Sequence, residues 1–286
     1  MTQASKTMSK QQCFEQLLLG KAVKSEAWLD KIRLEALVHA EVMSFPSARH
    51  DDWRFTDLSS LFSHSFQPIT SFARLTLGDV DKFLIPGSIR VVFVDGCYAA
   101  ELSDLTQAGS GVTVASLAER LGDKAVAANF GRHAPYKQDA FVALNTNFFE
   151  DGAWVHVATD AAVPIHLLHV ATKRETASAI YPRCMVVMES SSHATIVEDY
   201  VGIDDGIYFS NAVTEVVLKD HAQLHHVRVQ REQKNAFHIG HCSVAAGRNS
   251  VYSATSVALG ARACRAIPCM SRSRARALKC ISTAWL

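Results

Sequence analysis

The chain opens on two stretches with helical periodicity. Residues 10–19 form a short amphipathic pattern, and a longer pattern runs from Ser25 to Met43, with Ser25 as the expected N-cap. Pro46 disfavours helical geometry at Phe45, so we expect the second helix to end before that residue. These stretches predict a helical region at the start of the chain.

The middle of the chain mixes strand and helix patterns. Residues 90–94 are rich in Val and Phe, and Asp95-Gly96 follows, a pair that suits a type I′ turn; residues 90–98 therefore predict a β-hairpin. The same signal recurs at residues 148–157 around Asp151-Gly152 and predicts a second hairpin. Between them, residues 114–121 predict a short helix.

From residue 164 to residue 260 the chain consists of strand patterns that repeat every 28 residues. The aligned positions match in size, as in the ladders Ala194–Ala222–Ser250, Ile196–Leu224–Tyr252, Val186–Thr214–Cys242 and Met188–Val216–Val244. Residues of equal size that recur at a fixed period in strand-rich sequence predict a β-solenoid, in which each coil buries one face against the next.

The pattern divides the chain into four parts. Residues 1–67 are the expected N-terminal helical region, 68–160 a mixed α/β lead-in with hairpins, 161–262 the β-solenoid coils, and 263–286 a basic tail without periodicity. An open coil edge is a template for aggregation unless another element covers it. We expect the N-terminal region to cap one end of the solenoid.

Composition excludes several classes of protein. The 286 residues are 48% hydrophobic and 20% charged, which is typical of globular proteins, and the formal net charge of +1 argues against a nucleic-acid-binding protein. No run approaches the roughly 18 apolar residues of a membrane helix. The seven cysteines are odd in number and lack framework spacing, so we expect a cytoplasmic protein without disulfides.

Several segments resemble the SufB/SufD family of SUF iron–sulfur cluster assembly proteins, and SufD in particular. Residues 49–57, Arg-His-Asp-Asp-Trp-Arg-Phe-Thr-Asp, resemble the Arg-x-Glu/Asp-Asp/Glu-Trp-Arg-Tyr/Phe-Thr-Asp pattern of SufD proteins. Residues 144–146, Leu-Asn-Thr, with Asp151-Gly152 resemble a stretch common to SufB and SufD. Other segments follow in the family's order, namely residues 164–165, 182–183, 197–200, 209–211 and 224–230.

The resemblance implies a fold and a function. The fold would be mainly β, a right-handed parallel β-helix between an N-terminal helical region and a C-terminal helical domain. The function would be that of a non-enzymatic scaffold subunit that pairs with a SufB-like paralogue and works with a SufC-like ATPase, with any iron–sulfur cluster formed at the level of the complex. After about residue 262 the sequence departs from the family, so we expect the C-terminal helical domain to be missing and the SufC contact to be impaired.

The densest group of potential metal ligands is His221, His225, His226, His238 and His241 with Cys242. Four of them are the candidates for a site: His226, His238, His241 and Cys242. Imidazole and thiolate suit iron or zinc. A structural role explains these residues better: we expect His226 to face Glu198 on the preceding coil as an ion pair or hydrogen bond, and Cys242 to point inward as a small hydrophobe. We therefore expect no resident metal and keep these four residues as weak candidates.

The alternative function is a carbohydrate-active β-helix enzyme, a lyase or hydrolase. Asp51, Asp52 and Asp57 could supply paired carboxylates, although a surface loop anchored by Trp53 and Phe55 is the simpler interpretation. An enzyme of this kind would need acidic and basic side chains along one groove, and the aligned ladders are mostly apolar. Because nucleotide-binding and nucleophile-elbow motifs are also absent, we expect no catalytic residue.

Overall fold

The computed structural model describes residues 26–43, 45–46, 50, 53–54, 56–69 and 71–260, together with the backbone of residues 263–266, 270–273 and 282–285. The helix predicted at residues 10–19 and the expected cap Ser25 lie outside the described residues. Within the described part, no helix is long and apolar enough to cross a membrane.

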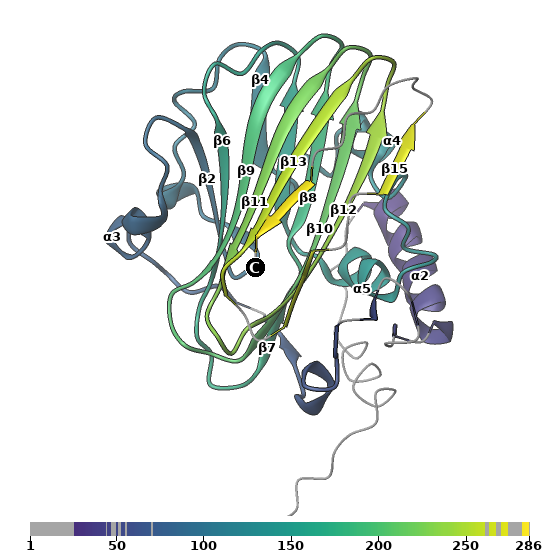
Figure 1. Cartoon of the computed structure of the whole chain (residues 1–286), viewed down its shortest axis with the longest axis vertical. Coiled ribbons are helices and arrows are strands. Elements are labelled where there is room, and N and C mark those ends of the chain that lie inside the picture. The colour runs from purple at the N-terminus through teal and green to yellow at the C-terminus, as the bar shows by residue number, and fades with distance from the viewer. Residues whose placement is uncertain are drawn as a thin grey trace, which may run out of the picture.

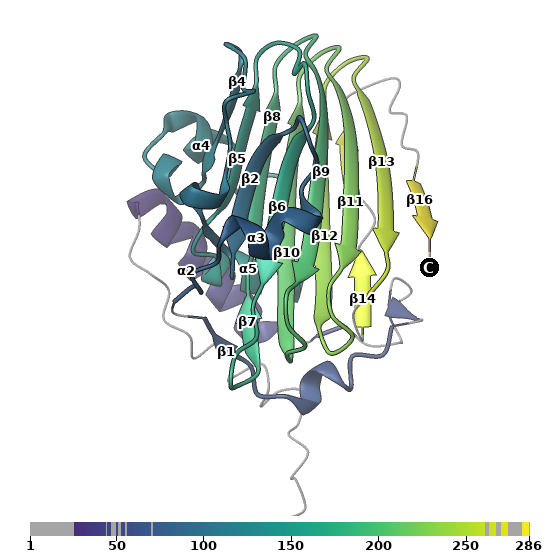
Figure 2. The same ribbon diagram turned by 90° about the vertical axis from the view of Figure 1, so that its left-hand side faces the viewer.

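Two long sheets face each other and form a β-solenoid (Figures 1 and 2). One sheet contains β1 (Gln67–Pro68), β4 (Val112–Ser116), β5 (Gly152–Val157), β7 (Ser178–Ile180), β8 (Arg183–Met188), β10 (Tyr208–Leu218) and β12 (Phe237–Ala246). The other contains β2 (Ile89–Val94), β3 (Cys97–Tyr98), β6 (Ile165–Ala171), β9 (His193–Gly202), β11 (Gln223–Arg231) and β13 (Val251–Ala258). From β5 onward the chain alternates between the sheets and stacked coils pair in parallel, so the prediction of a mainly β solenoid is confirmed.

The coils are not of equal length. Thr214 lies opposite Cys242 and Leu224 opposite Tyr252, which confirms the 28-residue offset for the last pair of coils. One coil earlier the offset is 30 residues, since β8 and β10 pair Val186 with Val216. Because two extra residues lie in the connection between those coils, the register differs from the predicted one. The wrong predicted pairs are Val186–Thr214, Met188–Val216, Ala194–Ala222 and Ile196–Leu224.

A repeated turn precedes β9, β11 and β13, where the chain enters the second sheet. Ser191, His221 and Asn249 have positive φ values of 63°, 64° and 54°. The turns stack through their backbones, because the Ser191 amide donates to the Asp220 carbonyl at 3.0 Å and the His221 amide to the Arg248 carbonyl at 2.8 Å. The spacing between these three residues along the sequence equals the length of each coil. The stacked turns therefore help to set the register.

The inside of the solenoid is apolar at one end. Inward positions there include Val155, Val186, Ile196, Val216 and Leu224, all nearly inaccessible to solvent. These side chains come from both sheets and form one cluster, as expected when two sheet faces are buried against each other. The other end of the interior is polar and is described below.

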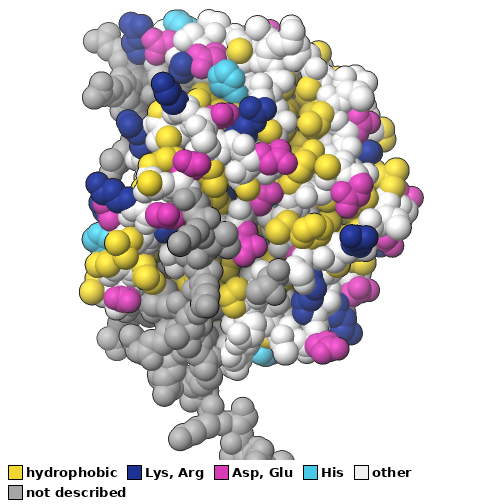
Figure 3. All heavy atoms as spheres, turned by 180° about the vertical axis from the view of Figure 1, so that it is seen from behind, with side chains coloured by type: hydrophobic (Ala, Val, Ile, Leu, Met, Phe, Trp, Pro, Cys, Tyr) yellow, Lys and Arg dark blue, Asp and Glu magenta, His cyan; other side chains and the backbone are white. Residues whose placement is uncertain are grey.

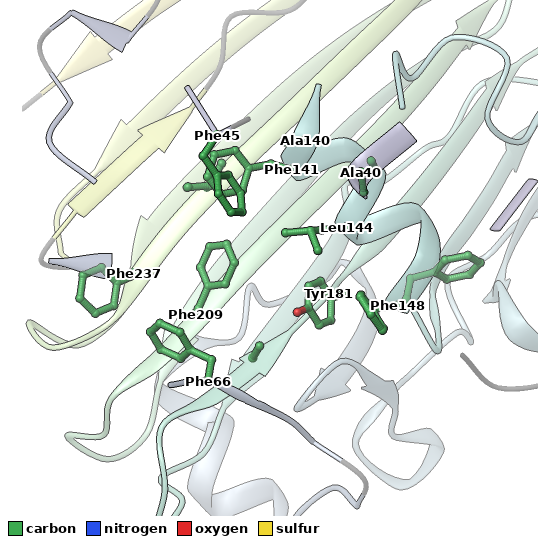
Figure 4. Close-up of a cluster of buried hydrophobic side chains, with 14 of the residues drawn as sticks. Ala40, Phe45, Phe66, Ala140, Phe141, Leu144, Phe148, Tyr181, Phe209 and Phe237 are labelled. Carbon is green, nitrogen blue, oxygen red and sulfur yellow. The ribbon is translucent and has the colours of Figure 1, made fainter. Parts of the chain in front are cut away.

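Helices cover the outer face of the first sheet. The described helical segments of this part are α2 (Ala27–Val42), η2 (Leu61–Ser63), η5 (Ala118–Arg120), α4 (Lys124–Asn129) and α5 (Ala140–Phe148). α2 confirms the predicted second helix, although Glu26 occupies the N-cap position and makes no side-chain capping bond. An aromatic cluster joins the helices to the strands, with Phe45, Phe66, Phe141, Phe209 and Phe237 in contact from distant parts of the chain (Figure 4).

The hairpin prediction at residues 90–98 is confirmed. β2 and β3 pair antiparallel with Phe93 opposite Tyr98, and Asp95 and Gly96 have φ values of 52° and 90°, as a type I′ turn requires. α3 (Leu77–Val80), η3 (Asp81–Phe83) and η4 (Ala100–Leu102) lie beside this hairpin and pack on the first strands of the second sheet.

One local prediction is partly wrong and another is wrong. Of the helix predicted at residues 114–121, only Ala118–Arg120 is helical, as the 3₁₀ helix η5. The first part belongs to strand β4, in which Val112, Val114 and Ser116 alternate inward with a period of two. Residues 148–157 are no hairpin, since Phe148 ends α5 and only β5 follows. Asp151 instead joins β3, β4, η5 and β5. Its carboxylate accepts hydrogen bonds from the Ser116 hydroxyl and from the backbone amides of Tyr98, Ala118 and Gly152.

The described residues after 260 form three more strands. β14 (Ala263–Ala266) and β15 (Met270–Ser273) pair in parallel with β12, and β16 (Ser282–Trp285) pairs in parallel with β13. In the described parts of residues 263–286, parallel pairing therefore continues beyond the coils that the sequence predicted. The boundaries of the four predicted parts stay a prediction.

The repeated turn leads to a prediction about stability. His221 is exposed and has a left-handed backbone, which a residue with a Cβ adopts at a cost, so His221→Gly should raise the free energy of unfolding by about 0.5–1 kcal/mol. His225→Gly is the matched control, because this exposed His lies in extended β11 and its replacement should destabilise. Urea unfolding measures both; a destabilised His221→Gly variant would contradict the prediction.

Candidate functional site

Polar side chains fill the end of the solenoid interior that lies opposite the apolar end. Glu198 and Tyr200 of β9, Thr214 of β10 and His226 of β11 are all buried, and Glu198 has no exposed surface. They occupy inward positions because side chains alternate along each strand, and the inward row continues from the apolar cluster. We call the polar end of the interior, centred on these four residues, the polar core.

The centre of the polar core is an ion pair between Glu198 and His226. Glu198 Oε1 lies 3.4 Å from His226 Nε2 and accepts a hydrogen bond from Thr214 Oγ1 at 2.7 Å. Tyr200 donates its hydroxyl to Glu198 Oε2 at 3.2 Å, and His226 Nδ1 lies 2.8 Å from the Tyr252 hydroxyl. The predicted contact between His226 and Glu198 is therefore confirmed.

The contact arises in a different register from the predicted one. His226 lies directly opposite Ile196, and Arg228 lies opposite Glu198, so the ion pair is diagonal across two parallel strands. Diagonal neighbours remain within reach of long side chains. The sequence therefore predicted the correct partner for His226, although the predicted offset between β9 and β11 was two residues too short.

Electrostatics keep both members of the pair charged. Burial alone would lower the pKa of His226, but the Glu198 carboxylate and contact with Cys242 outweigh burial and raise that pKa to about 9. Burial opposes ionisation of Glu198 too, yet His226, Arg228 and the Thr214 hydroxyl hold the pKa of its carboxyl well below the ordinary range. The pair is thus an imidazolium and a carboxylate at neutral pH.

A stack of rings extends the polar core toward the first coils. His169 of β6 lies between Phe93 and Tyr200, with ring centroids 4.9 Å and 4.7 Å away and the planes nearly parallel. The three residues are register partners on β2, β6 and β9. Burial lowers the pKa of His169 to about 4, so its imidazole is neutral and packs as an aromatic ring.

The remaining candidate residues are not gathered at one place. His238 Nδ1 lies 2.9 Å from Glu232 Oε2, and its ring meets Tyr200 edge-on at 4.7 Å. His241 is buried, with Nε2 2.9 Å from the Ser243 hydroxyl, and the alternation of β12 places it on the face opposite Cys242.

Cys242 lies close to His226. Its Sγ is 3.5 Å from the Tyr252 hydroxyl, and it faces inward as expected. Among the described residues, no group of three or more His, Cys, Asp or Glu side chains is arranged to hold a metal ion. Whether His226, His238, His241 or Cys242 binds a metal in solution stays a prediction.

Sequence reasoning missed a second buried network, on the outer face of the first sheet. Arg183 forms an ion pair with Glu215 and donates to Asn145 Oδ1 at 3.0 Å and Thr146 Oγ1 at 3.1 Å. Asn145 Nδ2 donates to the carbonyls of Pro182 and Asn211, each at 2.8 Å.

The Glu215 carboxylate also binds the loop before α5. It accepts hydrogen bonds from the amides of Gly131 at 3.0 Å, His133 at 3.2 Å and Ala134 at 3.1 Å. Arg183 and Glu215 both have no exposed surface. This network therefore fastens α5 and the loop to the solenoid, and its partners are too far apart in sequence for local patterns to reveal.

Of the three carboxylates near Trp53, only Asp57 lies in the described part of the structure. Asp51 and Asp52 lie outside the described residues, whereas Asp57 is exposed and accepts from the amide and hydroxyl of Ser59 at 2.9 Å and 2.5 Å. Trp53 is buried and stacks on Phe141 with centroids 5.3 Å apart, which confirms its predicted anchoring role. Phe55, its expected companion, lies outside the described residues.

Comparison with known proteins assigns the family. Residues 12–167 match the model of the SufBD protein N-terminal region, and residues 169–277 match that of the SUF system FeS cluster assembly, SufBD core domain. The chain belongs to the SufB/SufD family. The second match covers the coils that contain the polar core.

Three relatives agree with this assignment. An iron–sulfur cluster assembly SufBD family protein of Synechocystis is 31% identical over 236 residues, which cover 78% of this chain and 52% of the relative. Iron–sulfur cluster assembly protein SufD of Escherichia coli is 26% identical, with 68% and 45% covered, and the chloroplastic protein ABCI7 of Arabidopsis thaliana is 27% identical, with 76% and 47% covered. The chain spans about half the length of these relatives.

The ion pair of the polar core predicts a pH dependence of stability. The folded-state pKa of His226 is about 9, above the ordinary 6.5. The contribution of its charge to the free energy of unfolding is therefore complete below pH 6.5 and is lost as pH rises through 9. The loss should be on the order of 3 kcal/mol. Glu198→Gln should remove this slope, since the neutral amide no longer favours the imidazolium.

Urea unfolding between pH 6 and pH 9.5 measures that slope. His221→Gln is the control, because His221 is exposed and outside the polar core. A Glu198→Gln variant that is folded and keeps the wild-type slope would refute the role of the pair.

Burial also predicts the reactivity of the inward thiols. Burial and the nearby Glu198 carboxylate raise the pKa of Cys184, and Cys242 is fully buried. Cys184 and Cys242 both lie opposite Thr214, on the two strands that flank β10. Their Cα atoms are therefore two strand spacings, or about 9.6 Å, apart, which is too far for a disulfide.

Iodoacetamide should therefore modify Cys184 and Cys242 only after unfolding, and no disulfide should join them. Peptide mapping by mass spectrometry, with and without urea, measures both. Rapid modification of either thiol in the native protein would show that the coil interior is open.

Proposed function

We propose that this chain is a scaffold subunit of the SUF iron–sulfur cluster assembly machinery and that it acts through its interfaces without turnover. The observation that carries the proposal is the pair of SufBD family matches, which together follow the chain from residue 12 to residue 277 across both the helical region and the solenoid. The named functions of the relatives from Synechocystis and Escherichia coli support it.

The geometry of the polar core fits a scaffold. Its carboxylates Glu198 and Glu232 are almost completely buried and are paired with His226 and His238, so they are out of reach of a polymeric substrate. A carbohydrate lyase or hydrolase would need its carboxylates in an accessible groove. No observation in the described structure favours that alternative.

We propose the partners from the family as well. The chain would pair with a SufB-like paralogue and work in the cytoplasm with a SufC-like ATPase, and an iron–sulfur cluster would form at the level of the complex. The surface supports partners of this kind more than nucleic acid, since acidic and basic side chains are interspersed on the face seen in Figure 3 and neither sign dominates.

Co-expression with SufB-like and SufC-like proteins from the same source, followed by affinity capture of this chain, tests the proposal. We expect the SufB-like protein to be recovered in stoichiometric amount. Capture of the SufC-like ATPase in the absence of the SufB-like protein would show that the chain contacts the ATPase directly. A folded chain that captures neither protein would contradict the proposal and leave the family likeness as one of fold.

A further inference from the structure

Residues 71–87 lie across the outer face of the second sheet and include α3 and η3 (Figure 2). We call this segment the strap. Val80 is its only buried residue, and most of its other residues are exposed. The side chains that the strap covers on β2 and β6 are at most 1% exposed, namely Val92, Val94, Leu168 and Val170. The strap thus hides an apolar strip of the sheet while burying little of itself.

Few hydrogen bonds hold the strap in place. In the described part of the structure, none joins its backbone to the backbone of another element, and three join it to side chains of the solenoid. The cover of the first sheet differs, because Glu215 alone accepts hydrogen bonds from three backbone amides of the loop before α5. A segment with few buried side chains and few hydrogen bonds has a low local stability and opens while the rest of the protein stays folded.

Two arginines fasten the strap, one at each end. Arg174, which follows β6, forms an ion pair with the buried carboxylate of Asp95, and it donates to the Ser71 carbonyl at 2.7 Å. The same carboxylate accepts a hydrogen bond from the Ala73 amide at 3.2 Å. The guanidinium therefore links a carboxylate of the solenoid to the backbone of the strap, and we call this arrangement a clasp.

The clasp at the other end is built in the same way. Arg231, at the end of β11, donates from Nε to Asp199 Oδ1 at 3.0 Å and from Nη2 to the Phe83 carbonyl at 3.3 Å. Its guanidinium also lies 5.0 Å from the centre of the Phe83 ring. The side chains of Arg174 and Arg231 are 26% and 34% exposed, so water can replace the strap carbonyls as acceptors. Release of the strap then leaves no buried charge unpaired, because each arginine keeps its carboxylate.

We propose that the strap is a lid that opens as a unit on the folded solenoid when its two clasps release it. An open strap uncovers the apolar strip on β2 and β6, so the clasps control whether this strip is accessible to solvent. The proposal goes beyond the scaffold function and does not depend on it.

Thiol labelling of the full chain tests the proposal. Val170→Cys places a thiol under the strap, and Val213→Cys is the matched control, because Val213 is equally buried on the outer face of the first sheet, where α2 and α5 cover it. In the native protein, we expect iodoacetamide to label the Val170→Cys variant roughly tenfold faster than the Val213→Cys variant, given the lower local stability of the strap. The buried thiol of Cys184 reports global unfolding in each sample.

Substitution of a clasp separates opening of the strap from general fluctuations. Arg231→Gln, added to Val170→Cys, should raise the labelling rate roughly tenfold, because a hydrogen bond from a charged group is lost. Arg248→Gln is the control, since Arg248 is paired with Asp220 at the turn before β13, and it should leave the rate unchanged. Equal labelling of the Val170→Cys and Val213→Cys variants, or labelling of the former only together with Cys184, would overturn the proposal.

Trypsin digestion of the protein without a new cysteine provides a second measurement. Lys82 is exposed in the strap, and Lys219 is exposed at a turn of the solenoid. Because a protease cleaves a locally opened chain, we expect cleavage after Lys82 to precede cleavage after Lys219, and Arg231→Gln should accelerate the former alone. Resistance of the bond after Lys82 until the solenoid unfolds would contradict the proposal.

Discussion

The fold depends on the register in which one coil lies on the next. Side chains alternate along a strand, so a slip of one residue would turn the inward row of a coil toward solvent. The offset shortens from 30 residues between β8 and β10 to 28 between β10 and β12, yet the inward rows still match. The connections absorb the difference, and the stacked left-handed turns at Ser191, His221 and Asn249 fix where β9, β11 and β13 begin.

The two halves of the interior contribute in different ways. The apolar half supplies stability through burial, and its Val and Ile residues would tolerate small shifts. The polar half is less tolerant, because an unpaired Glu198 or His226 would leave a buried charge, which is strongly destabilising. A network in which Glu198 meets His226, Thr214 and Tyr200 at once therefore selects a single register.

Sequence patterns predicted those features that depend on nearby residues. The Asp95-Gly96 turn and α2 are local, and the repeat was visible because equal-sized residues recur along the chain. The same reasoning failed at residues 148–157 and in the first part of the helix predicted at residues 114–121, where contacts with β5 and with Asp151 override the local signals. It found the His226–Glu198 pair but missed Arg183 with Glu215, since nothing in the sequence indicates that α5 packs beside these strands.

Three of the segments that resemble the family lie together in the structure. They are residues 144–146 (Leu-Asn-Thr), 182–183 (Pro-Arg) and 209–211 (Phe-Ser-Asn). The three stretches meet at the buried network, where Asn145 contacts Pro182, Arg183 and Asn211. Asn211 in turn donates to the Phe141 carbonyl at 2.8 Å. Residues from β8, β10 and α5, with Pro182 just before β8, thus satisfy each other's polar groups, and replacing any one of them leaves a buried donor or acceptor without a partner. Such motifs therefore mark a joint between the helical region and the solenoid that many buried hydrogen bonds hold in place, as the proposed scaffold function would require.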